Sequence, residues 1–230
     1  MPLSRREQLR IETTAEIKST ARQQMAEVGA AALSLRAIAR KMRMSAPALY
    51  RYFANRDALV TALIVEAYGS LGAVMAAADA EIDRKDFHGR FQATADAFRH
   101  WALAHPQDFT LIYGTPIPDY EAPREQTVEP AGNVLQQFGT ILHEAAQAGK
   151  LQVSDRYRTL PTGLQKSIDE LRPFLPDAVS TEVIILTMVI WSLLYGLVWG
   201  ELYGHFPPGL AESGELYMLE VGTLCVRLGL

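Results

Sequence analysis

An aromatic and basic cluster stands close to a proline in the stretch MSAPALYRYF, residues 44–53, where Tyr50, Arg51 and Tyr52 follow one another. Phenolic hydroxyls and guanidinium groups can donate hydrogen bonds to phosphate oxygens, so this combination is suited to holding a polyanion. Small residues precede the cluster and would let a helix approach its partner closely: Ala46, Pro47 and Ala48. The chemistry that these residue types indicate is binding, not bond-making.

Apolar spacing and capping residues predict four helices around this cluster. A 4-4-3 spacing marks one face of the first helix, which Gly29 would end: Ile17, Ala21, Met25 and Val28. Ser34, Ser45 and Asn55 stand where the N-caps of the next three helices are expected. Pro47 falls in the first turn of the third helix, where its missing N–H costs little.

The two short middle helices have the pattern of a helix-turn-helix. Leu49 and Phe53 lie four residues apart and share an inward face with Met44, which leaves the aromatic and basic residues outside. A short RMS connection joins this helix to the one before it. Small residues at the start of the exposed helix would let it enter the major groove of DNA.

The charge is unevenly distributed along the chain. Residues 1–60 carry eleven Lys/Arg against five Asp/Glu, a net of +6, and the remainder carries eleven against twenty-one, a net of −10. A basic head on an acidic body is typical of a nucleic-acid-binding module with a separate partner domain. A solvated helical surface would give the same balance, so charge alone leaves both interpretations open.

The whole run LSLRAIARKMRMSAPALYRYFANRDALVTAL, residues 33–63, resembles the DNA-binding signature of the tetracycline-repressor (TetR) family. The shared features are IA in the second helix, S-x-x-x-LY-x-YF in the third, and N-R-D-AL opening the fourth. The resemblance implies an all-α homodimer with a three-helix DNA-binding head at residues 1–57. It implies an effector-binding and dimerisation domain at residues 58–230, and a palindromic operator that is released when a small molecule binds.

Positions in the DNA-binding signature carry over as expected DNA contacts. They are Arg36, Arg43, Ser45, Ala46, Pro47, Ala48, Tyr50, Arg51, Tyr52 and Arg56. The resemblance implies phosphate contacts for Tyr50 and Tyr52, and Arg56 stands where a lysine usually meets the DNA backbone. Arg51 is either a base-reading residue or a solvated arginine.

Arg43 and the N-terminal arginines leave alternatives open. Arg43 stands where the family usually has glycine, and a left-handed conformation there would cost about 1–2 kcal/mol. Its side chain would either reach DNA or be an exposed, solvated arginine. Near the N-terminus, Arg5, Arg6 and Arg10 would form either a minor-groove arm or a flexible, solvated tail.

The remainder of the chain reads as helices separated by prolines, with loops at 114–123 and 152–163 and two final helices near 179–204 and 213–229. The segment HWALAHPQDFTLIYGTPIPDYEAP resembles the TetR C-terminal domain type named for a Trp-His-Gly pattern, with Tyr195 in place of its histidine. Candidate effector-binding residues, each equally explicable as core, are Phe98, Trp101, Phe109, Tyr113, Phe138, Leu142, Met188, Trp191 and Tyr195. Their apolar, aromatic character predicts an uncharged or weakly charged, lipophilic effector.

Residues 183–200 contain no charge, which is close to the lower limit for a membrane span. The flanking Glu182 and Glu201 give no positive bias to set a topology, and a helix buried on every side would look the same. A ridge of small residues recurs every fourth position: Ser192, Gly196, Gly200 and Gly204. Because glycines destabilise a helix, we expect close approach of another helix in compensation, namely that of a second subunit.

An enzyme is the other class of protein to consider. The sequence has no HExxH, P-loop or GxSxG motif, and Cys225 lies in an apolar helix where packing is its expected role. We therefore expect no catalytic residue, no metal and no cofactor. The N-terminus lacks the apolar region of a secretory signal, so we expect a cytoplasmic protein without membrane contact. A membrane-anchored helical protein and an enzyme with an unrecognised site remain the alternatives.

Overall fold

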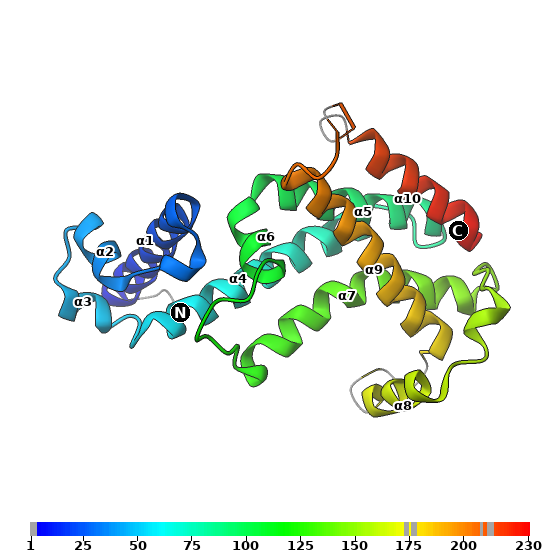
Figure 1. Cartoon of the computed structure of the whole chain (residues 1–230), viewed down its shortest axis with the longest axis horizontal. Helices are drawn as coiled ribbons and strands as arrows, with labels where there is room; N and C mark the ends of the chain where they lie inside the picture. Colours follow the sequence, from blue (N-terminus) through cyan, green and yellow to red (C-terminus); the bar gives the residue numbers. More distant parts are fainter. Residues whose placement is uncertain (1–3, 173–174, 176–178, 208, 211–213) are drawn as a thin grey trace. The chain divides into compact units, whose positions relative to one another are not determined.

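The computed structural model describes residues 4–172, 175, 179–207, 209–210 and 214–230, and it contains helices but no strand in those ranges. The helices in chain order are α1 (Arg5–Val28), η1 (Ala30–Ala32), α2 (Leu35–Lys41), α3 (Ala46–Tyr50), α4 (Arg56–Ala80), α5 (Phe87–Ala104), α6 (Pro106–Tyr113), α7 (Arg124–Gln147), η2 (Asp155–Tyr157), α8 (Thr162–Leu171), α9 (Thr181–Leu202) and α10 (Glu215–Leu228) (Figure 1). The predicted all-α class is confirmed. Helix α8 was not predicted, and the loop expected at 152–163 overlaps only its first two residues.

The chain forms two compact units. Unit one comprises Met1–Gly69 and His105–Pro130, and unit two comprises Ser70–Ala104 and Ala131–Leu230. The boundary expected between residues 57 and 58 lies in the first turn of α4. Unit one extends further because apolar residues of α6 and its following loop pack against the core of the head: Leu111, Ile112, Ile117 and Tyr120.

The core of unit one is built from the apolar stripes of its first four helices. Ile17 and Ala21 of α1 are buried together with Leu49 and Phe53, the inward pair around α3. The apolar stripe of α4 within unit one is fully buried: Leu59, Leu63 and Ala67. Val28, which we expected on the inward stripe of α1, is instead 54% exposed, because α1 ends there and Gly29 turns the chain at a positive φ of 78°.

Hydrogen bonds fasten α6 and the loop after it to the head. The Arg22 guanidinium in α1 donates through Nε to both carboxylate oxygens of Asp108, at 2.8 and 2.9 Å. Asp108 is only 6% exposed, so this ion pair lies largely out of water. Thr61 of α4 shares a 2.9 Å hydrogen bond with the Tyr120 hydroxyl. Four elements of unit one are thereby held in register by polar as well as apolar contacts.

A buried arginine organises one end of unit two. The guanidinium of Arg90 in α5 is fully buried and donates to Asp79 of α4 and Glu144 of α7, each at 2.6 Å. Burial alone would raise the pKa of Asp79, but hydrogen bonds from Arg90 and Arg84 outweigh it and hold that pKa below its usual range. Helices α4, α5 and α7 therefore meet at one buried guanidinium, whose positive charge is balanced by carboxylates.

A second set of contacts joins α5 to the last two helices. Arg99 of α5 donates through Nε to Glu201 of α9 at 2.8 Å, and the buried Tyr217 hydroxyl of α10 donates to the Ala95 carbonyl at 2.7 Å. Helices α4 and α9 are each long and apolar enough to cross a membrane by length and composition, and half of each apolar window is buried inside the protein.

Candidate nucleic-acid interface

Helices α2 and α3 form the predicted helix-turn-helix. The Ser34 hydroxyl accepts a hydrogen bond from the Ala37 amide at 3.4 Å, and the Ser45 hydroxyl accepts one from the Ala48 amide at 3.3 Å. Both serines are thus the N-caps that the sequence indicated, and each orients the start of its helix. Ser45 is exposed, although its hydroxyl makes this capping hydrogen bond.

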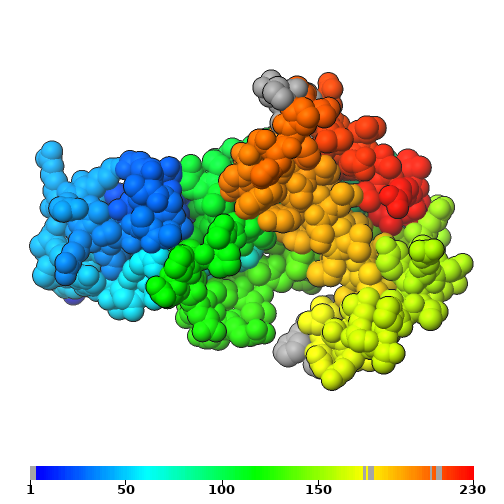
Figure 2. All heavy atoms as spheres, in the orientation of Figure 1, coloured from blue at the N-terminus to red at the C-terminus, as the bar shows by residue number. Residues whose placement is uncertain are grey.

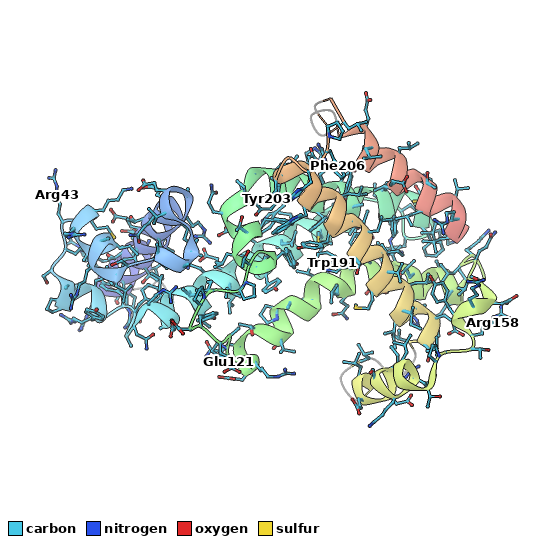
Figure 3. All side chains as sticks on the ribbon, viewed as in Figure 1. Arg43, Glu121, Arg158, Trp191, Tyr203 and Phe206 are labelled. Carbon is cyan, nitrogen blue, oxygen red and sulfur yellow. The ribbon has the colours of Figure 1, made fainter. Side chains whose placement is uncertain are left out.

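The turn between the two helices depends on Arg43. Its φ of 54° is left-handed, as expected for a position that usually holds glycine. The Arg43 amide donates to the Arg40 carbonyl at 3.1 Å, and the next amide donates to the Ala39 carbonyl at 2.9 Å. The side chain projects outward from the turn (Figure 3), so the strained backbone presents a charge to solvent.

Helix α3 separates its large side chains as the sequence predicted. Leu49 and Phe53 are 0% and 8% exposed, whereas Tyr50 is 44% exposed and Arg51 is also exposed. Tyr52 is half-buried against the core of the head. Among the small residues, Pro47 is exposed and Ala46 and Ala48 are half-buried. The outer surface of α3 therefore offers a shallow small-residue patch followed by one phenol and one guanidinium.

Four arginines of α2, the turn and the end of α3 are exposed: Arg36, Arg40, Arg43 and Arg51. None has a carboxylate within ion-pair distance in the described part of the chain. Arg40 was missed in the sequence, although its place one turn after Arg36 on the outer face of α2 could have identified it. Lys41 beside it pairs with Glu27 at 3.2 Å. The four uncompensated guanidinium groups make this surface locally cationic.

Arg56 has partners within the head that sequence reasoning missed. Its guanidinium donates to the carbonyl oxygens of Ala30 and Ala31, at 3.3 and 3.0 Å. These bonds tie the start of α4 to the connection between α1 and α2. A phosphate contact by Arg56 would have to compete with them, so its structural role is the positioning of that connection.

The candidate effector-binding residues divide between the two units. Phe109 and Tyr113 belong to unit one, where their ring centroids are 5.3 Å apart. In unit two the rings of Phe98 and Trp191 lie 4.9 Å apart. Phe98, Trp101, Phe138 and Leu142 are buried, and Trp191 and Tyr195 are half-buried. Met188 of α9 is 41% exposed.

Two further features of unit two were not expected from the sequence. The Thr94 side chain is fully buried, and its hydroxyl has no hydrogen-bond partner among the described residues. An open pocket lies elsewhere in the unit and contains none of the candidate effector residues; its lining is Ala146, Leu151, Val153, Arg158, Ser180 and Glu182.

The ridge of small residues on α9 does not lie on a single exposed face. Ser192 and Gly196 are exposed, but Gly200 is buried beneath Phe206 of its own chain, and Gly204 lies beyond the end of α9 at a positive φ of 67°. A Cβ at Gly200 would lie 2.5 Å from the Phe206 ring. The glycine at this position is therefore explained by packing within the subunit, and substituting it would not probe a subunit interface.

Comparison with known proteins identifies the family. Residues 17–63 match the sequence profile of the bacterial regulatory proteins of the tetR family, and residues 91–224 match the tetracyclin repressor-like C-terminal domain. The chain belongs to the TetR family. Its TetR relatives are transcriptional regulators with a DNA-binding helix-turn-helix, a non-enzymatic class, so the prediction that this chain is not an enzyme is confirmed.

Similar proteins of the TetR family align over nearly the whole chain. The HTH-type transcriptional regulators Rv1816 of Mycobacterium tuberculosis and Mb1846 of Mycobacterium bovis are each 29% identical over 94% of both chains. The crystal structure of SCO4313, described as a regulatory protein, is 33% identical, covers 97% of this chain and 98% of its own, and has a TM-score of 0.77. A tetR-family regulatory protein from Rhodococcus RHA1 is 19% identical with a TM-score of 0.64 and shares the fold.

We predict that Arg43→Gly makes the protein more stable. Glycine adopts the left-handed conformation without the Cβ clash, so the free energy of unfolding should rise by about 0.5–1 kcal/mol. Arg43→Ala removes the same charge but keeps the Cβ, and it should give no gain. Urea unfolding followed by circular dichroism measures both. A loss of stability in Arg43→Gly would mean that the arginine side chain makes stabilising contacts that outweigh the backbone strain.

Proposed function

We propose that this TetR-family regulator is a cytoplasmic repressor that binds a palindromic operator as a homodimer and releases it when a small molecule binds. Residues 1–57 would contact DNA, and residues 58–230 would hold the effector and the second subunit. The observation that carries the proposal is the uncompensated cationic surface around α3, with Tyr50 and Arg51 exposed beside small residues. Helix α9 lies within the C-terminal family match, which supports its burial in a protein without a membrane span.

The side chains of α3 and its surroundings fall into residues suited to phosphate contacts and one residue suited to base recognition. Alanine and proline side chains offer no hydrogen bonds to bases, so only Arg51 on the exposed surface of α3 can make a bidentate base contact. Tyr50 and the arginines of α2 and the turn have the chemistry of phosphate contacts. Sequence preference would then come from Arg51, from thymine methyl groups and from the shape of the DNA.

We predict different effects for substitutions at Tyr50 and Arg51. Tyr50→Phe removes one hydroxyl and should weaken binding to all DNA sequences alike, by about 0.5–1.5 kcal/mol. Arg51→Ala should change the preference among operators by about 1–3 kcal/mol at one base pair. Both are measured by fluorescence anisotropy against single-base variants of an operator selected from genomic fragments. Uniform loss for Arg51→Ala would make it a phosphate contact, and no loss for Tyr50→Phe would remove that residue from the interface.

An exposed apolar face on α9 and α10 supports the homodimer. The two helices lie side by side on the face of unit two shown in Figure 2, with no other element over them. Six of their apolar residues are 36–75% exposed: Met188, Val189, Leu193, Met218, Leu219 and Val226. Ser192 and Gly196 lie on the same face of α9 and would let a second copy approach closely. The interface that we propose is therefore centred on these residues and excludes Gly200.

We predict that Leu193→Glu dissociates the dimer. A two-fold contact would bring two introduced carboxylates together, and such like-charge contacts cost several kcal/mol, so the dimer dissociation constant should rise at least about 100-fold. Sedimentation equilibrium at micromolar concentration measures this change. Val74→Glu is the control, because Val74 is similarly exposed at 39% but lies on α4. A folded Leu193→Glu protein that stays fully dimeric would move the interface elsewhere.

The buried hydroxyl of Thr94 supports an effector site inside unit two. Thr94 lies one turn before Phe98, whose ring packs against Trp191, so the hydroxyl belongs to the aromatic side of α5. A buried hydroxyl without a partner destabilises the protein that carries it, and a ligand that accepts or donates there would remove the penalty. The effector class that fits is aromatic or lipophilic with one hydrogen-bonding group.

We predict opposite effects of Thr94→Val on stability and on effector response. The free protein should gain about 1–3 kcal/mol of stability, because an unsatisfied polar group is replaced by a methyl of similar shape. Release of the operator should require at least about tenfold more of a compound found by screening for release, and Thr94→Ser should keep the wild-type response. Thermal unfolding and operator-release titrations measure the two effects. An unchanged titration for Thr94→Val would exclude the hydroxyl from the effector site.

A further inference from the structure

Helix α1 extends well beyond the part of the head that it helps to pack. Its first buried residue is Ile17, although the helix begins at Arg5, and none of the residues between them is buried. This N-terminal extension, residues 5–16, is about 18 Å long at 1.5 Å per residue. The family match also begins only at residue 17. The extension is therefore not needed to complete the core of the head.

The extension is a capped helix and not the flexible tail that the sequence left open. Ser4 and Glu7 form a reciprocal capping box, with the Ser4 amide donating to the Glu7 carboxylate at 2.8 Å and the Glu7 amide donating to the Ser4 hydroxyl at 3.3 Å. Gln8 donates to the Glu12 carboxylate at 2.8 Å. Two of the three acidic side chains in the extension, Glu7 and Glu12, thus have hydrogen-bond partners in the N-cap and first turns of α1.

The inward stripe of α1 changes from apolar to basic where the helix leaves the head. Arg10 and Arg6 precede Ile17 by seven and eleven residues, which places both within about 20° of its direction on a helix of 3.6 residues per turn. Neither guanidinium has a carboxylate within ion-pair distance in the described chain. Arg5, by contrast, lies about 120° away from this stripe.

We propose that Arg6 and Arg10 bind the phosphate backbone of DNA next to the surface formed by α2 and α3, so that the extension enlarges the DNA contact of each subunit. This inference rests on the proposed function. A face that is apolar against protein and basic beyond it fits a polyanion better than more protein. In Figure 1, α1 starts at the end of unit one that carries α3 and ends beside α6.

The width of the helix determines how it can meet DNA. An α-helix with its side chains is about 10–12 Å wide, whereas the minor groove is about 6 Å wide. As a helix, the extension is therefore too wide for the undistorted minor groove, which argues against the minor-groove arm among the two alternatives left by the sequence. It lies along the backbone, where arginine side chains reach phosphate oxygens without reading bases. Its contribution to affinity is accordingly independent of sequence and sensitive to salt.

Another protein is the competing occupant, because Leu9 and Ile11 are 62% and 53% exposed. Both lie well off the stripe of Arg6 and Arg10, at about 80° and 120° from Ile17. A protein contact through them would change the state of assembly, whereas a phosphate contact through the stripe would not. The two occupants therefore give different results when the arginines are replaced.

The test compares Arg6→Gln/Arg10→Gln with Arg5→Gln in the full-length protein. Glutamine keeps the helix propensity of arginine, and far-UV circular dichroism verifies that the extension remains helical. Binding to a labelled mixed-sequence duplex is measured by anisotropy over a series of NaCl concentrations. For the double variant, the slope of log Kobs against log [NaCl] should become shallower by about 0.9 for each lost contact, about 2 per bound subunit. Arg5→Gln should leave the slope close to that of the wild type.

Three results would overturn the inference. In the first, the salt slope of Arg6→Gln/Arg10→Gln equals that of the wild type. In the second, Arg5→Gln changes the salt slope as much per residue as the double variant does. In the third, the double variant changes the sedimentation of the protein and leaves the salt slope unchanged. In each case Tyr50→Phe still weakens binding if the proposed function is right. Failure of the wild-type protein to bind any duplex would instead contradict the proposed function itself.

Discussion

The ion pair between Arg22 and Asp108 is the constraint on which the organisation of unit one depends. The Arg22 Nε–H is shared by both carboxylate oxygens of Asp108, and the low exposure of Asp108 means that its charge cannot be left unpaired without a desolvation penalty. Arg22 and Lys18 also pair with Glu66 of α4, at 3.7 and 2.5 Å. Helix α1 is thereby joined to α4 and α6 at one point, and the helix-turn-helix rests on the core that these helices form.

This arrangement makes α6 part of the DNA-binding unit, although it is far away in the sequence. The Tyr68 hydroxyl donates to the Ile112 carbonyl at 3.3 Å, and the Tyr68 and Tyr113 rings meet edge to face. Helix α6 is therefore in direct hydrogen-bonded contact with both α1 and α4. Because coupling free energies are reciprocal, DNA bound at α3 would in turn bias the position of α6 within unit one.

Local patterns predicted the helices of the head, and the contacts between distant residues could not be predicted. Caps at Ser34 and Ser45 and the stripe of α4 involve residues within a few positions of one another, so the sequence carries them directly. Arg22 and Asp108 are separated by 86 residues, and no local spacing relates them. Arg56 shows the same limit, because its carbonyl partners at residues 30 and 31 come from a turn whose position depends on the fold.

The small residues of α9 show that spacing in the sequence does not reveal which segment packs against them. Close approach explains a buried glycine whether the neighbour belongs to the same chain or to another. Here the chain turns back after α9, with the His205 amide donating to the Gly200 carbonyl at 2.9 Å, and this places Phe206 over Gly200. Gly196 has no atom within 4 Å of where its Cβ would be. Gly200 therefore packs within its own chain, whereas Gly196 faces open space.

A division between affinity and specificity follows from the side chains of the head. If α3 enters the major groove as proposed, it would do so with small residues and one guanidinium able to read a base, so most of its surface would give shape complementarity and little discrimination. The uncompensated arginines lie around α3, on α2 and the turn, where they can attract any phosphate backbone. Such a protein would bind DNA in general firmly and distinguish sequences modestly. Two copies held at a fixed spacing would then supply the selectivity that one head lacks, because only a palindrome with matching half-sites satisfies both heads at once.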